Sequence, residues 1–274
     1  MKLSEIRDCL RHREIDLTKS LGQNFLHDRN QLDRIAAAAE LSSSDKVIEV
    51  GPGLGALTEF ILRSGARVLA IEKDTRLCAF LAEQYGAESK FELLHADALE
   101  FFRMPGNWSQ WKFVSNLPYS VGSPILVEAA RQIERPKLIV VTLQLEVVQR
   151  LAAPAGEKNY GVLTLLLRLR YEAGGWFKIP AGSFFPAPEV DSACIVLRRR
   201  KTSLLPLGLE PLFDRIIKKA FSQRRKMTLK LLKEEWPAER LDIAWHAMGL
   251  APQARAETIE LEQFAALADL LSHD

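Results

Sequence analysis

Residues 46–65 read KVIEVGPGLGALTEFILRSG and carry the clearest indication of the fold class. The β-branched run at 46–51 ends at a glycine and is typical of a buried strand. Leu57 and Ile61 then recur at helical spacing and predict a helix that ends at Gly65. A strand, a glycine-rich turn and a helix begin a βαβ unit, so the stretch indicates a parallel sheet with helices on both faces.

The same alternation continues along the chain. It predicts strands at 67–72, 91–97, 112–117 and 137–144, and helices at 75–86 and 123–133. Two further apolar runs, 161–172 and 192–200, are expected to complete the sheet as an antiparallel pair. After Pro206 only segments of helical period remain. We therefore expect an α/β, Rossmann-like domain at residues 1–204 and a small all-α domain at residues 205–274.

The composition is that of an ordinary globular protein. Of the 274 residues 47% are hydrophobic and 26% are charged, which excludes disordered and collagen-like chains. The 37 Lys and Arg nearly balance the 35 Asp and Glu, so a nucleic-acid signal depends on where the charges lie. Cys9, Cys78 and Cys194 lack the spacing of a zinc or disulfide framework, and no segment has the pattern of a signal peptide or membrane span. We expect a cytoplasmic protein with free thiols and no metal.

The glycine loop has the features of a nucleoside-binding turn. Gly51, Gly53 and Gly55 follow the first strand, where a missing Cβ lets a ligand approach the backbone, although glycine there also serves plain turns. Glu72 ends the second strand, where a carboxylate can accept both hydroxyls of a ribose. The spacing G-x-G-x-G and the missing amide of Pro52 do not suit a pyrophosphate, which favours S-adenosylmethionine over a dinucleotide.

Two polar residues end the next strands. Asp97 closes the third strand and suits the amino group of a cofactor adenine, or else it is an N-cap of the following segment. Asn116 ends the fourth strand in NLPY, which Leu117, Pro118 and Tyr119 complete. If the Asn116 side-chain oxygen and the Leu117 carbonyl accept the two hydrogens of an adenine amine, its lone pair can turn toward a methyl donor, and Tyr119 can stack on the base. The alternative is an ordinary strand-to-loop turn.

These residues belong to motifs that run along nearly the whole chain. The motifs are GQNFLHD (22–28), VIEVGPGLGALT (47–58), IEKD (71–74), HADAL (95–99), NLPYSVGSPIL (116–126), LQLEVVQRLAA (143–153), YGVLTLLL (160–167), FFPAPEVDSA (184–193), AFSQRRKMTLKLL (220–232) and RAETIELEQF (255–264). Together they resemble the KsgA/RsmA-type 16S ribosomal RNA adenine N6-dimethyltransferases.

The resemblance implies a class I methyltransferase fold with a mostly parallel seven-stranded sheet. It implies that S-adenosylmethionine supplies two methyl groups to N6 of each of two adjacent adenosines in the 3′-terminal hairpin of 16S rRNA, in the pre-30S subunit. We expect the enzyme to be a monomer with no membrane partner. The implied cofactor contacts are Asn24, Leu26, Gly51, Glu72, Asp97 and Asn116, and Gly53 of the glycine loop is expected to join them.

Two loops are expected to complete the site. An amide-rich segment with Gln23 and Asn24 can hold the amino-acid part of the cofactor, or it can be the entry of the following helix. Phe185 lies between two prolines in FFPAP, and we assign it to the face of the target adenine opposite Tyr119. A core position for Phe185 is the alternative, and Phe184 could exchange roles with it.

A basic segment points to RNA. Between Arg215 and Lys233 eight of nineteen residues are basic and none is acidic. Such a run can be only a solvated face, but it also suits the RNA backbone, and Arg198–Lys201 can extend it. We expect contacts from Lys219, Arg224, Arg225, Lys226 and Lys230. Leu145 stands where the resembled enzymes commonly have lysine, and an asparagine often found after the RRK element is missing, so details of RNA contact differ.

Three other functions remain as alternatives. An Erm-like 23S rRNA adenine N6-methyltransferase would use the same chemistry, but such enzymes tend to lack the FFPAP and FSQRRK patterns found here. A non-catalytic ribosome assembly factor would not need Asn116. A nicotinamide-dependent dehydrogenase would bind the reduced dinucleotide and have no affinity for RNA.

Overall fold

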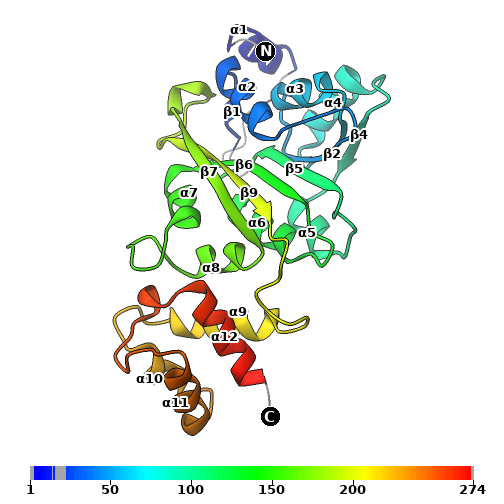
Figure 1. Ribbon diagram of the computed structural model, residues 1–274. Helices are drawn as coiled ribbons and strands as arrows, with labels where there is room; N and C mark the ends of the chain where they lie inside the picture. Colours follow the sequence, from blue (N-terminus) through cyan, green and yellow to red (C-terminus); the bar gives the residue numbers. More distant parts are fainter. Residues whose placement is uncertain (1–2, 14, 16–22, 273–274) are drawn as a thin grey trace. The chain divides into compact units, whose positions relative to one another are not determined.

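A computed structural model describes residues 3–13, 15 and 23–272. Its main sheet has seven strands in the order β4-β3-β2-β5-β6-β9-β7 (Figure 1). In chain order the strands are β2 (Lys46–Val50), β3 (Arg67–Glu72), β4 (Phe91–His95), β5 (Trp111–Asn116), β6 (Leu138–Gln144), β7 (Tyr171–Ile179) and β9 (Ser192–Arg199). The pairs from β4 to β6 are parallel and β9 is antiparallel to β6, as expected. The predicted α/β fold with a mostly parallel sheet is confirmed.

Strand β2 is the point where the order of the sheet reverses. It pairs with β3 on one side and with β5 on the other, both parallel. The loops that leave the carboxyl ends of β2 and β5 therefore diverge, and open α/β sheets bind their ligands in the crevice between such loops. The glycine loop and the NLPY segment both start at this edge.

Helices pack on both faces of the sheet. On one face α2 (Arg29–Ala38) and α3 (Ala56–Arg63) share a buried apolar cluster with alternate strand residues such as Val47 and Val140. On the other face α5 (Ala98–Arg103) places the Phe102 ring 5.4 Å from the ring of Phe113. The remaining helices within residues 3–152 are α1 (Leu3–His12), α4 (Thr75–Tyr85), α6 (Gly122–Arg131) and α7 (Leu145–Ala152).

The strand predicted at 161–172 is wrong. Residues Val162–Arg168 form helix α8, and strand β7 begins only at Tyr171. A continuous leucine run suits a buried helix as well as a buried strand, and here Leu165, Leu166 and Leu167 are all buried. The actual strand is mostly exposed and contains two glycines, so it carries no apolar signal.

The chain divides into two compact units. The first comprises Met1–Val148 and Ala173–Arg199, and the second comprises Gln149–Glu172 and Arg200–Asp274. The second unit thus combines the C-terminal part of the chain from Arg200 with an earlier segment, Gln149–Glu172, that lies outside the predicted helical domain at 205–274. Arg170 of that segment is buried and donates from Nε to Glu210 Oε2 over 2.9 Å, which ties it to the C-terminal helices. These are α9 (Glu210–Ala220), α10 (Thr228–Leu232), α11 (Ala238–Ala247) and α12 (Leu261–Ser272).

A second, two-stranded sheet joins two distant motifs. Strand β1 (Phe25–Leu26) pairs antiparallel with β8 (Phe184–Phe185), which brings the QNFL segment beside the FFPAP segment. The three cysteines are free, as predicted. In the part of the chain that the structure describes, no helix is long and apolar enough to cross a membrane.

Candidate active site

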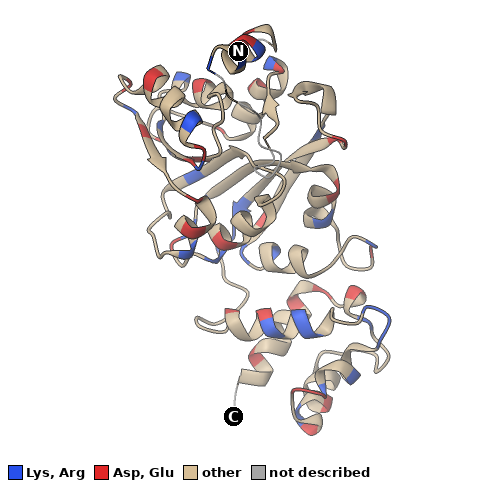
Figure 2. Cartoon of the chain, turned by 180° about the vertical axis from the view of Figure 1, so that it is seen from behind, with Lys and Arg blue, Asp and Glu red and all other residues tan. Residues whose placement is uncertain are grey.

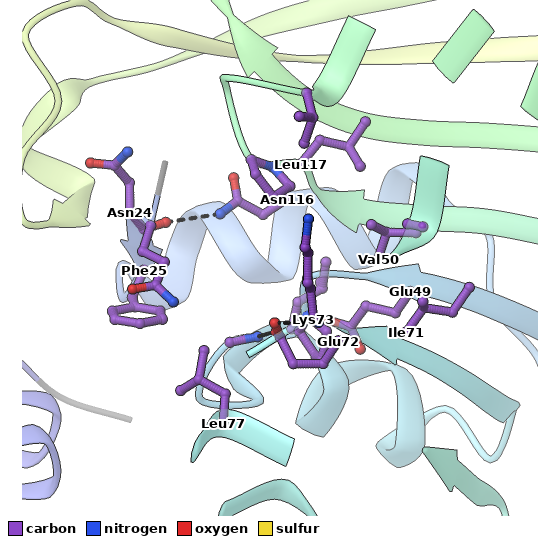
Figure 3. A pocket seen from close by; sticks show the side chains of 18 of the residues that line it. Asn24, Phe25, Glu49, Val50, Ile71, Glu72, Lys73, Leu77, Asn116 and Leu117 are labelled. Carbon is purple, nitrogen blue, oxygen red and sulfur yellow. Dashed lines mark hydrogen bonds between the residues drawn. The ribbon is translucent and has the colours of Figure 1, made fainter. Parts of the chain in front are cut away.

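A pocket lies at the carboxyl ends of strands β2, β3, β4 and β5 (Figure 3). It brings together most of the residues that the sequence singled out. The predicted residues in its lining are Asn24, Leu26, Gly51, Gly53, Glu72, Asp97, Asn116, Leu117, Pro118 and Tyr119. Phe185 is not among its lining residues.

The glycine loop is held closely by its neighbours. Gly51 and Gly53 have φ angles of +62° and +60°, a backbone region that favours glycine. A Cβ at Gly53 would lie 2.8 Å from the ring of Phe25, and one at Gly51 would lie 3.3 Å from Pro118. The loop therefore needs glycine because the QNFL and NLPY segments approach it closely.

Glu72 presents a buried carboxylate to the pocket. Its Oε1 accepts the backbone amides of Lys73 and Asp74 over 2.8 and 2.9 Å, and its Oε2 lies 3.4 Å from the Gly53 amide. Burial nevertheless raises the pKa of Glu72 above its usual value. These bonds fix the carboxylate at the end of β3, where two hydroxyls of a ligand can donate to its remaining lone pairs.

Asp97 is the N-cap of α5, the alternative that the sequence left open. Its Oδ1 accepts the Leu99 amide over 2.8 Å, and its Oδ2 accepts a hydrogen bond from Lys73 Nζ, also over 2.8 Å. The Lys73 ammonium holds the pKa of Asp97 below its usual value, so this carboxylate stays charged. Since Asp97 also lines the pocket and a carboxylate has about four acceptor positions, capping does not exclude a ligand contact.

Asn116 carries an unpaired acceptor at the pocket wall. Its Nδ2 donates to the backbone carbonyl of Asn24 over 3.1 Å (Figure 3). A carbonyl can only accept, so the amide nitrogen faces Asn24 and the oxygen faces the other way. That Oδ1 atom is buried and has no hydrogen-bond partner among the described residues. Buried acceptors are rarely left unpaired, and this oxygen is available to accept a hydrogen bond from a ligand in the pocket.

Tyr119 is held at the same edge. Its hydroxyl is hydrogen-bonded to the hydroxyl of Ser192, and its ring lies edge-on to the Phe184 ring at 6.5 Å. Phe184, rather than Phe185, is thus the aromatic residue of FFPAP that contacts Tyr119. Phe185 packs beside the apolar cluster of α1 and α4, and the Arg7 guanidinium lies 5.3 Å from its ring centroid.

A family model described as "Ribosomal RNA adenine dimethylase" matches residues 15–273. The chain belongs to the ribosomal RNA adenine dimethylase family. Two of its relatives are named ribosomal RNA small subunit methyltransferase A. The one from Myxococcus xanthus is 39% identical, over 95% of this chain and 93% of its own length. The one from Geobacter metallireducens is 37% identical, over 94% of this chain and 97% of its own length.

Two solved structures share the architecture. A dimethyladenosine transferase from Plasmodium falciparum is 25% identical with a TM-score of 0.76, over 89% of this chain and 95% of that chain. The 23S rRNA methyltransferase ErmE is 27% identical with a TM-score of 0.69, over 91% of this chain and all of that chain. This member of the dimethylase family is therefore a methyltransferase, and its α/β fold is the one its relatives use.

Two charged residues that line the pocket of this dimethylase were not predicted from the sequence. Glu49 is buried in β2 and accepts a hydrogen bond of 2.6 Å from Thr58, and burial raises its pKa to about 8. Lys73 of the IEKD motif donates its backbone amide to Glu72 and its ammonium to Asp97. A glutamate inside the apolar run VIEV was the available signal for the first; nothing in the sequence pointed to the second.

In the predicted RNA-binding segment of this family member, only some of the basic side chains lack an ion-pair partner among the described residues. Three of its basic residues are engaged within the second unit: Arg215 pairs with Glu235, Lys219 with Glu234 and Lys233 with Asp242. Arg224 donates to the backbone carbonyl of Lys158. Lys218, Arg225, Lys226 and Lys230 have no ion-pair partner among the described residues, and Figure 2 shows the connection between α9 and α10 in blue.

Proposed function

We propose that this enzyme uses S-adenosylmethionine to dimethylate N6 of two adjacent adenosines in the 3′-terminal hairpin of 16S rRNA, within the pre-30S subunit. It would do so as a monomer in the cytoplasm, where its substrate is assembled. The observation that carries the proposal is the buried, unpaired Oδ1 of Asn116 beside Tyr119 at the edge of the pocket. The names of the small-subunit relatives support the choice of substrate.

The chain's own atoms can activate an adenine amine. The amine is a weak nucleophile because its lone pair is delocalised into the ring. Oδ1 of Asn116 would accept one of its hydrogens and the Leu117 carbonyl the other, which lets the nitrogen become pyramidal and directs its lone pair into the pocket. Tyr119 would stack on the base, and the released proton can pass to water. Orientation and hydrogen bonding supply the catalysis, so no general base is needed.

The residues of the pocket fit the proposed methyl donor, whose sulfonium supplies an electrophilic methyl group. Glu72 would accept hydrogen bonds from the ribose hydroxyls, and Asp97 would accept one from the adenine amino group. Asn24 and Leu26 of the QNFL segment would contact the amino-acid part of the donor. Among the described residues, Lys73 is the one cation in the lining, and it is already paired with Asp97. A lining with three carboxylates, those of Glu49, Glu72 and Asp97, and with no unpaired cation among the described residues suits a donor without phosphates and disfavours a dinucleotide.

Incubating unmodified 30S subunits with labelled donor and enzyme tests the proposal. Mass spectrometry of the 16S fragments is expected to show two dimethylated adenosines near the 3′ end. In a parallel incubation with 23S rRNA, a block to primer extension there, with no modification of 16S rRNA, would instead indicate the chemistry of the Erm-like alternative. Absence of any transfer, with particle binding intact, would indicate a non-catalytic assembly factor.

The raised pKa of Glu72 predicts a pH-dependent affinity for the donor. Ribose hydroxyls donate best to an ionised carboxylate, so protonation of Glu72 weakens binding. We expect the Kd to rise as the pH falls from neutral, starting at a higher pH than for an ordinary glutamate because burial raises this pKa. Glu72→Gln should bind about ten-fold more weakly with a flatter pH profile. Calorimetric titration measures this, with exposed Glu59→Gln as the control; a flat wild-type profile would contradict the assignment.

We propose that the helical segment at 205–274 contacts the RNA backbone through the cations that remain available, foremost Arg225, Lys226 and Lys230. Arg225→Glu should weaken binding to pre-30S particles and reduce the log–log salt slope by about one. Donor affinity should not change, because the pocket lies in the first unit. Filter binding over a salt series measures both quantities. Arg103→Glu makes the same charge change on α5 outside this segment, and equal effects of the two substitutions would refute the proposed contact.

A further inference from the structure

Ser192 carries a buried hydroxyl at the start of the apolar part of strand β9. It begins β9, is fully buried, and is followed by apolar residues from Ala193 to Leu197. Burying a hydroxyl in such a strand is unfavourable unless it is hydrogen-bonded. Its partner is the hydroxyl of Tyr119, which lies 73 residues earlier in the chain.

The backbone at Ser192 is firmly held. Ser192 lies opposite Gln144 in the antiparallel register of β6 and β9. The preceding residue, Asp191, accepts the Leu145 amide at its carbonyl over 2.9 Å and the Ala181 amide at Oδ1 over 3.0 Å. The Ser192 hydroxyl is therefore a fixed point at the carboxyl edge of the sheet.

The backbone of Tyr119, unlike that of Ser192, is not part of a sheet. It lies in the turn that follows β5, outside any helix or strand, and its side chain lines the pocket. Two interactions with described residues orient its ring: the hydrogen bond from the hydroxyl to Ser192, and the edge contact with Phe184, at 69° between the ring planes. Loss of the hydrogen bond would leave the orientation of the ring less restricted, and ordering it again would oppose stacking of a base.

We propose that Ser192 is a positioning residue that acts through Tyr119: its hydroxyl holds the tyrosine ring in a fixed orientation for stacking with the target adenine. This inference rests on the proposed function. It gives Ser192, near the end of the FFPAPEVDSA motif, a role in recognising the base. If the role of Ser192 were purely structural, its hydrogen bond with Tyr119 would only pair two buried hydroxyls.

Kinetics of three variants test the inference. Ser192→Ala and Tyr119→Phe each remove one of the two hydroxyls, and the double variant removes both. Each single variant should lower kcat on unmodified 30S subunits about three- to ten-fold, the effect of one neutral hydrogen bond, with the donor Kd unchanged. The double variant should match the single ones, because both changes remove the same bond. Tyr160→Phe deletes a buried hydroxyl in the second unit and should leave kcat unchanged.

A direct readout of stacking separates positioning from stability. We would place 2-aminopurine at the target adenine and measure the quenching of its fluorescence on binding, with anisotropy as the measure of affinity. Ser192→Ala should quench less than wild type at equal occupancy. Equal quenching and equal kcat would overturn the inference, and Tyr119→Phe provides the same test if Ser192→Ala does not fold. If wild-type enzyme transfers no methyl group to 16S rRNA, the proposed function itself fails instead.

Discussion

Asn116→Ala is expected to lower kcat for methyl transfer about a thousand-fold, the upper range for removing a preorganised hydrogen-bonding group at a reacting centre. The side-chain oxygen of Asn116 is buried and unpaired, so its removal takes away the acceptor for one hydrogen of the adenine amine. The lone pair of that amine then stays delocalised in the ring. Single-turnover transfer to unmodified 30S subunits measures the loss without interference from product release.

The matched variant is Asn116→Asp, which keeps the size and an acceptor but replaces the amide nitrogen. A carboxylate oxygen would then face the Asn24 carbonyl, where Nδ2 now donates over 3.1 Å. We expect this repulsion to turn the side chain and to lower kcat as well. Both variants should bind pre-30S particles as wild type does. Near-normal turnover of Asn116→Ala would refute the mechanism, since no other side chain is assigned to accept that hydrogen.

The parallel strands and the glycine loop were predictable because their signals are local. The run KVIEVG shows a buried strand by composition, and Gly51 and Gly53 indeed have positive φ angles. Glu72 and Asn116 were predictable for a related reason: each ends a strand of a parallel sheet, and such strands end at one edge. Helix α8 was not predictable in this way, because a run of leucines has no period that separates a helix from a strand.

The contacts that complete the site are long-range and leave no local trace. The bond from Asn116 to the Asn24 carbonyl spans 92 residues, and the one between Tyr119 and Ser192 spans 73. The pairing of β1 with β8 decides which phenylalanine contacts Tyr119, and it places Phe184 there. Ion pairs in the basic segment, such as that of Lys219 with Glu234, likewise depend on how helices pack. Charge counting along the chain therefore does not show which cations are ion-paired within the second unit.

A buried lysine, Lys112, lies at the opposite edge of the sheet, and we expect it to stabilise the first unit. Lys112 begins the buried part of β5, and its ammonium donates to the carbonyls of Ala39 and Glu40 and to Asp45, over 3.0, 2.6 and 2.9 Å. All three of its donors are thus used. The two carbonyls lie just past the end of α2, where a helix leaves carbonyls unpaired, so Lys112 both caps α2 and ties it to the sheet.

Lys112→Met is expected to lower the free energy of unfolding by about 3–5 kcal/mol, because it breaks a buried pair and leaves two carbonyls without this donor. Arg198→Met breaks the exposed pair with Glu40 on the same edge and should cost less than about 1 kcal/mol. Urea denaturation measures both. Equal costs of the two substitutions would show that α2 does not depend on the lysine cap.

The same lysine makes stability depend on pH through Asp45. Burial opposes ionisation of Asp45, but hydrogen bonds from Lys112 and Lys137 hold its pKa well below the usual value. The stabilisation from this ionised carboxylate is present above the pKa of Asp45 in the unfolded chain and is lost as the pH falls. Wild type should therefore lose more stability in acid than Lys112→Met.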